Sequence, residues 1–214
     1  MGAEKKPYIA VRPVNHPGVV PNQAIWRGSN ALPYWSYQGC DGNEAEIEVY
    51  TTAYEVELFV NGRSVDRVKT EDYTAEFRTI YEPGELRAVA LNRDGSIHSE
   101  NSLFSADGNT KIQILPEEDN VKRGDILYLD ISLIGENSEI ECNRDTKLGI
   151  AIEGGELLAF GSANPKTEET FLSGIYTTYY GRSQAVIKIC EEQVHIRVSG
   201  EGIAPADTMI RVTE

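Results

Sequence analysis

Apolar and polar residues alternate along short stretches of this chain, and that period of two is the dominant pattern. In VELFV, residues 56–60, the apolar side chains of Val56, Leu58 and Val60 fall on one face of an extended strand. Asn61-Gly62 follows, the pair preferred in the two-residue type I′ turn because both positions need a positive φ. The pattern therefore predicts a β-hairpin that continues into RSVDRV, residues 63–68.

The same alternation recurs on both sides of this hairpin. AEFRTIY, residues 75–81, and ELRAVALN, residues 85–92, are separated by Glu82-Pro83-Gly84. Turn signals continue at intervals of roughly 8–12 residues, the spacing typical of β-sandwiches. No window of 11 or more residues keeps a period of 3.6, so almost no helix is expected.

A domain boundary is predicted at Ser105-Ala106-Asp107-Gly108-Asn109, a run of small and turn-forming residues. Each half then has the roughly 100 residues that an immunoglobulin-like sandwich needs. We therefore predict an all-β protein of two tandem immunoglobulin-like β-sandwich domains. The first covers residues 1–106, with an N-terminal linker segment 1–25, and the second covers residues 107–214.

Composition narrows the classes of function. The 214 residues carry a formal net charge of −14, which repels phosphate backbones and argues against nucleic acid as a partner. No stretch approaches the roughly 20 apolar residues of a membrane-spanning helix, so no membrane partner is expected. The first thirteen residues lack the apolar core of a secretory signal. The compartment stays open between cytoplasm and export.

The usual catalytic and metal-binding patterns are not found. Three cysteines and three histidines show no ligand spacing, so no metal, no cofactor and no disulfide framework are expected, and the cysteines are interpreted as structural thiols. The pairs Glu46/Glu48 and Glu55/Glu57 share sheet faces at i, i+2. They are either acid/base groups or the solvated face of a strand, and the apolar residues between them favour the second. No catalytic residue is assigned.

The aromatic residues offer a more specific hypothesis. Trp26, Tyr34, Trp35 and Tyr37 fall within twelve residues, and aromatic rings can stack on the C–H faces of sugars. They are our candidate carbohydrate contacts. The alternatives are packing against another domain and a buried tryptophan in the sandwich core, which is common in such folds.

Three segments in order resemble a known family. The first holds WSYQG (35–39), IEVY (47–50) and VELFVNGRSV (56–65), the second holds YEPGEL (81–86), and the third runs from GSANP (161–165) to TYYGR (178–182). Together they resemble the C-terminal β-sandwich region of glycoside hydrolase family 2 enzymes, the β-galactosidase and β-glucuronidase-like group.

The resemblance implies a parent enzyme that hydrolyses β-glycosides by the retaining route, with two glutamates on a (β/α)8 barrel N-terminal to this region. A barrel takes about 250 residues, and nothing here corresponds to one. The chain is then expected to be a non-catalytic accessory region that supports the barrel, shapes access to its active site or mediates contacts between copies of the parent. Its expected partners are the barrel, a glycan or a second parent chain. The alternatives are a stand-alone carbohydrate-binding module and an adhesin-like tandem immunoglobulin protein.

Overall fold

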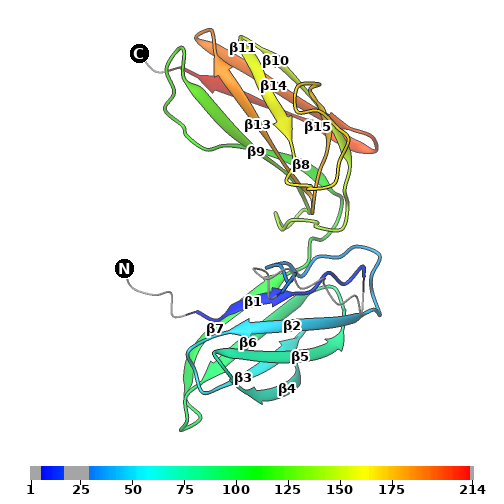
Figure 1. Cartoon of the computed structure of the whole chain (residues 1–214), viewed down its shortest axis with the longest axis vertical. Coiled ribbons are helices and arrows are strands. Elements are labelled where there is room, and N and C mark those ends of the chain that lie inside the picture. Colours follow the sequence, from blue (N-terminus) through cyan, green and yellow to red (C-terminus); the bar gives the residue numbers. More distant parts are fainter. Residues whose placement is uncertain (1–5, 17–28, 213–214) are drawn as a thin grey trace. The chain divides into compact units, whose positions relative to one another are not determined.

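A computed structural model describes residues 6–16 and 29–212, and throughout these residues the chain is built from β-strands without a helix (Figure 1). It divides into two compact units, residues 1–105 and 106–214, which are treated separately below. The division falls one residue before the boundary expected from the sequence. Within the described ranges, no helical segment has the length and apolarity to cross a membrane.

The first unit is a sandwich of two antiparallel sheets, in the orders β1-β2-β5 and β4-β3-β6-β7. In immunoglobulin terms the first sheet holds strands A, B and E, and the second holds C, F and G, with β4 added beside C. The seven strands are β1 (Tyr8–Val11), β2 (Glu44–Tyr50), β3 (Glu55–Val60), β4 (Arg63–Lys69), β5 (Thr74–Ile80), β6 (Glu85–Leu91) and β7 (Ile97–Phe104).

The predicted hairpin is confirmed in its details. Val60 pairs with Arg63, and the two residues between them, Asn61 and Gly62, have φ values of 49° and 75°. The Asn61 side chain also donates to the carbonyl of Pro83 at 3.0 Å and accepts from the N–H of Glu85 at 2.8 Å. Local sequence therefore sets the pairing at the turn, beyond which a bulge shifts the register between Leu58 and Phe59. The same turn is tied to the next connection along the chain.

The interior of the first sandwich follows from the alternation. Val56, Leu58 and Val60 are fully buried on β3, and Ile47 and Val49 are buried on β2 of the other sheet. One end of this core is aromatic, because the ring of Tyr81 contacts those of Trp35 and Tyr37 edge-on.

The second unit is also a sandwich, with sheets in the orders β11-β13-β9-β8 and β12-β10-β14-β15. The first sheet has the D-E-B-A order of a constant-type immunoglobulin domain, and the second has the C-F-G order, with β12 added beside C. Its strands are β8 (Lys111–Pro116), β9 (Ile126–Ile134), β10 (Lys147–Glu153), β11 (Gly155–Gly161), β12 (Ile175–Thr177), β13 (Arg182–Ile189), β14 (Gln193–Gly200) and β15 (Ile203–Arg211).

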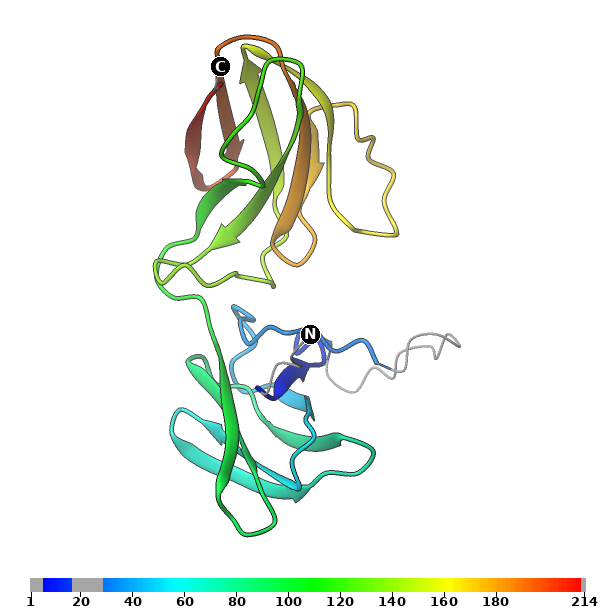
Figure 2. The same cartoon turned by 90° about the vertical axis from the view of Figure 1, so that its left-hand side faces the viewer.

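The core of this second sandwich is mostly aliphatic, with leucine, isoleucine and valine from both sheets around Phe160 and Tyr176. The long connection between β11 and β12 extends from the side of the sandwich (Figure 2). It is fastened at Glu169, whose carboxylate accepts from the N–H and hydroxyl of Thr177 at 3.1 and 3.0 Å. The expectation of two tandem β-sandwiches is thus confirmed.

Candidate functional site: a polar hollow on the first sandwich

The outer face of the β1-β2-β5 sheet gathers charged and aromatic side chains. Because successive residues of a strand point to opposite faces, burying Ile47 and Val49 turns Glu46, Glu48 and Tyr50 outward. The strand register then aligns these residues in rows across the sheet. Tyr8 lies opposite Tyr50 in one row, and Ala10, Glu48 and Glu76 form the next.

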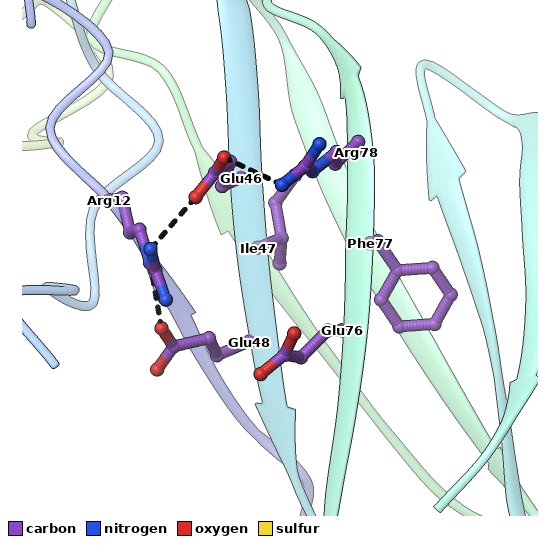
Figure 3. A pocket seen from close by; sticks show the side chains of 7 residues that line it. All are labelled: Arg12, Glu46, Ile47, Glu48, Glu76, Phe77 and Arg78. Atoms are coloured by element: carbon purple, nitrogen blue, oxygen red, sulfur yellow. Dashed lines mark hydrogen bonds and ion pairs between the residues drawn. The ribbon is translucent and has the colours of Figure 1, made fainter. Parts of the chain in front are cut away.

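Glu48 is the centre of a hydrogen-bond network. Its Oε1 accepts from Arg12 Nε at 3.0 Å and from Ser29 Oγ at 2.7 Å, while its Oε2 accepts from the Tyr50 hydroxyl at 2.5 Å. Arg12 also pairs with Glu46 at 2.9 Å, so one guanidinium bridges two carboxylates (Figure 3). Of these donors, Tyr50 lies on β2, whereas Arg12 and Ser29 come from other segments. The network therefore forms only when β1 and the chain at Ser29 are in place beside β2.

The remaining groups complete a polar hollow of about 360 Å³. Arg78 pairs with Glu46 at 3.3 Å from the side away from Arg12, and Glu76 lies opposite Glu48 in the register. Figure 3 shows the Phe77 ring turned away from the charged group. The charged lining thus consists of three glutamates and two arginines.

The electrostatics follow from this geometry. Burial alone would raise the pKa of Glu48, but the hydrogen bonds from Tyr50, Ser29 and Arg12 outweigh it and hold that pKa below its ordinary value. Burial and the neighbouring Glu48 carboxylate raise the pKa of Tyr50 to about 12. Glu48 is therefore ionised and Tyr50 is protonated near neutral pH, which suits the hollow to hydrogen bonding and not to proton transfer.

The two glutamate pairs differ in their exposure to solvent. Glu55 and Glu57 lie on a partly solvated face as expected, where Glu55 pairs with Arg67 at 2.6 Å and Glu57 accepts from Ser64. Glu48 was expected to be solvated too, and that was wrong: it is buried. The reason is that Arg12, 36 residues away, and Ser29 cover its carboxylate.

The aromatic candidates within the described residues, Tyr34, Trp35 and Tyr37, do not form an open group. Trp35 and Tyr37 are each 0% exposed, and their contacts with Tyr81 correspond to the core-packing alternative, which leaves neither ring face free for a sugar. Tyr34 is half-buried. Trp26 lies outside the described residues. Sugar contact by Tyr34 or Trp26 stays a prediction.

The sequence did not predict a pair of exposed tyrosines on this face. Tyr8 and Tyr50 lie side by side on the outer face, with ring centroids 6.3 Å apart. The signal that could have found Tyr50 was its i, i+2 spacing from Glu48, which places both on one face. Tyr8 could not be found, because its position depends on the pairing of β1 with β2.

Other polar groups carry less chemistry. His195 faces outward from β14, as expected from its buried neighbours Val194 and Ile196, and its Nε2 lies 3.0 Å from Asp207 Oδ1. Cys40 and Cys142 are buried, and Cys190 is half-buried. In the parts of the chain that the structure describes, no group of three or more His, Cys, Asp or Glu side chains could hold a metal.

Two family models match the chain, one in each sandwich. Residues 42–98 match a domain of unknown function, DUF4982. Residues 112–209 match the glycoside hydrolase family 2 C-terminal domain 5.

Individual proteins are also similar to this chain. The β-galactosidase BoGH2A of Bacteroides ovatus is 25% identical over 175 residues, which cover 78% of this chain and 20% of that enzyme. The solved structure of a glycosyl hydrolase family 2 member from Bacteroides cellulosilyticus has a TM-score of 0.83 at 23% identity, and covers 97% of this chain and 28% of that one. A β-glycosidase from Bacteroides vulgatus has a TM-score of 0.72 at 21% identity, with 85% and 24% covered. The chain thus spans between 20% and 28% of the length of these three proteins. The second sandwich matches a C-terminal domain of glycoside hydrolase family 2, and the chain as a whole is similar to C-terminal regions of proteins of that family.

Proposed function

We propose that this region is non-catalytic and that it supports a catalytic barrel of the parent protein, shaping access to its active site or contacts between its copies. Hydrolysis of a β-glycoside by the retaining route needs one carboxylate as nucleophile and a carboxylic acid of raised pKa as proton donor. The parent is proposed to carry both on the barrel and to act on β-galactosides or related β-glycosides, as the name of the Bacteroides ovatus relative suggests.

The observation that carries this proposal is the state of Glu48. Of the carboxylates that line the hollow, it is the buried one, and burial is what ordinarily raises the pKa of a glycosidase acid. Here three hydrogen bonds reverse that effect and lower its pKa. A carboxylate held ionised in this way cannot deliver a proton to a leaving group at neutral pH.

The test is turnover by the isolated chain. Residues 1–214 should release no more product from aryl β-galactosides or β-glucuronides than a buffer blank, whereas the full-length parent should be active. The matched control is the isolated chain carrying Glu46→Gln and Glu48→Gln. Turnover by the unmodified chain that disappears in this double variant would place catalysis in the hollow and overturn the proposal.

The supporting role has its own measurement. The parent protein lacking residues 106–214 should lose thermal stability, oligomeric state or activity relative to the intact parent. A truncated parent that matches the intact one in all three would contradict the supporting role, while leaving the absence of catalysis in this region untouched.

A further inference from the structure

We propose that the outer face of the β1-β2-β5 sheet binds neutral sugar residues of a glycan, with Tyr8 and Tyr50 as the stacking surface and the adjoining hollow as the hydrogen-bonding surface. This goes beyond the supporting role. It rests on the side chains of the first sandwich and does not depend on where the parent's catalysis takes place.

The tyrosine pair provides the stacking surface. Tyr8 is 52% exposed and Tyr50 is 39% exposed, although they lie opposite each other on neighbouring strands and their rings are only 6.3 Å apart. Their planes are inclined by 48°, so the two rings form an angled surface instead of stacking on each other. Such a surface offers two ring faces to the C–H groups of a pyranose.

A tyrosine in the turn that precedes β5 is retained at a conformational cost. Tyr73 occupies the second position of the Asp72-Tyr73 turn with a φ of 65°, where glycine is strongly preferred. Its carbonyl accepts from the N–H of Thr51, directly after Tyr50. The side chain is 71% exposed, so packing does little to offset the strain. Strain of this kind is concentrated at functional sites.

The hollow beside the tyrosine pair combines hydrogen-bond donors with acceptors. Glu76 is exposed and accepts hydrogen bonds, while Arg78 is exposed and donates them. Sugar hydroxyls both donate and accept, so they need the two kinds of partner within reach of one another. The volume of about 360 Å³ is at the lower end of the range for small-ligand sites, roughly 300–1,000 Å³.

The charge balance selects among sugars. Three glutamates and two arginines line the hollow, so it carries one net formal negative charge. The whole chain carries −14. Uronic acids and phosphorylated sugars are repelled by such a surface, and neutral hexoses are not.

The surface is also fixed in advance of binding. The Tyr50 hydroxyl is held by Glu48, and Glu48 is held by Arg12 and Ser29. Because the ring is already oriented, less conformational freedom is lost when a sugar stacks on it. Glu48 and Arg12 are thus positioning residues for Tyr50.

The experiment is a titration of the ¹⁵N-labelled chain with oligosaccharides of equal length, followed by amide chemical shifts. The probes are a β-linked galactotetraose, a β-linked glucotetraose and a tetrasaccharide that alternates glucose with glucuronic acid. We expect saturable shifts at the amides of Tyr8, Tyr50 and Glu76 with at least one neutral probe, and weaker binding of the acidic probe.

Three variants locate the surface. Tyr8→Ala should weaken binding by about tenfold, because one stacking ring is lost. Tyr50→Phe keeps the ring but loses the bond to Glu48, and should weaken binding less than Tyr8→Ala. The matched control is Tyr128→Ala, which removes a similarly exposed ring from the second sandwich and should leave the affinity unchanged. The amide spectrum of each variant also reports whether it is folded.

Several results would overturn the inference. They are flat titrations with both neutral probes, an affinity that a folded Tyr8→Ala variant retains, and tighter binding of the acidic probe than of either neutral one. None of these would bear on the turnover assay. Failure of the glycan surface and failure of the non-catalytic assignment can therefore be told apart.

Discussion

The two sandwiches place charged groups on their sheet faces in different ways. In the first, Glu48 has a side chain only 6% exposed and is enclosed by Arg12, Ser29 and Tyr50. In the second, Asp207 on β15 also pairs with an arginine, Arg197 at 3.1 Å, but its side chain is 40% exposed. Ion pairs open to water contribute little to stability, whereas a buried charge that loses its partners is costly. The same chemical pair is thus a structural requirement in one sandwich and a surface feature in the other.

The hydrophobic cores of the two sandwiches also differ. The first sandwich closes one end with Trp35, Tyr37 and Tyr81, so we expect the largest effect from Trp35→Ala. Removing a fully buried tryptophan should cost the first sandwich about 3–5 kcal/mol of unfolding free energy. Residue-resolved hydrogen exchange should show the loss in residues 29–105 and little change in β8–β15. A loss spread equally over both sandwiches would show that they do not unfold separately.

The next effect separates the two carboxylates. Glu48→Ala leaves Arg12, Ser29 and Tyr50 without their common acceptor and should destabilise the first sandwich by about 2 kcal/mol. Asp207→Ala should cost the second sandwich less than about 1 kcal/mol. Both tryptophans of the chain lie in the first unit, so urea unfolding followed by tryptophan fluorescence measures the cost of Glu48→Ala. The cost of Asp207→Ala is measured by residue-resolved hydrogen exchange of strands β8–β15. Equal costs for the two variants would erase the proposed distinction.

The pH dependence should also distinguish the sandwiches. Because the pKa of Glu48 is lowered in the folded state, its contribution is present above the ordinary glutamate pKa of about 4.3 and is lost as the pH falls through the native value. In the second sandwich, hydrogen bonds from Thr177 lower the pKa of Glu169 in spite of burial, but burial raises those of Glu139 and Asp145. A raised pKa has the opposite sign, since its contribution is present at low pH and is lost on deprotonation.

We therefore expect the first sandwich to lose stability below about pH 4 more steeply than the second. The measurement is hydrogen exchange or urea unfolding of the whole chain between pH 3 and pH 6. Glu48→Gln should flatten the curve of the first sandwich. A curve that keeps its slope in this variant would mean that other carboxylates set it.

The smallest predicted effect concerns the strained turn. Tyr73→Gly relieves a positive φ but adds freedom to the unfolded chain, so a net stabilisation of no more than about 1 kcal/mol is expected. Asn61→Ala, at the other type I′ turn of the first sandwich, should instead destabilise by about 1 kcal/mol. The midpoint of urea unfolding tests both, and a destabilised Tyr73→Gly variant would show that the exposed ring packs against something.

The sequence predicted what depends on neighbouring residues. The alternation at Val56, Leu58 and Val60 and the Asn61-Gly62 turn were sufficient for the hairpin, because both signals act within ten residues. The network at Glu48 could not be predicted, since its donors Arg12 and Ser29 are brought to it by chain pairing over 36 and 19 residues.

The aromatic residues illustrate the same limit. A group of tryptophan and tyrosine residues in a segment without regular alternation is compatible with a sugar-binding surface. It is equally compatible with packing in the sandwich core. The outcome for Trp35 was decided by its contact with Tyr81, 46 positions along the chain. The exposed tyrosines, in contrast, are separated by 42 positions and meet only because β1 pairs with β2.

The Asn61-Gly62 turn also exposes the protein to chemical ageing. An asparagine before glycine loses ammonia readily through a cyclic imide, because the glycine N–H is unhindered, and the ring reopens to aspartate or isoaspartate. Aspartate would place a carboxylate oxygen against the carbonyl of Pro83, where the Asn61 amide now donates. Isoaspartate would add a methylene to the main chain inside a two-residue loop. Deamidation of Asn61 in stored protein would therefore disturb the pairing of β3 with β4 at this turn.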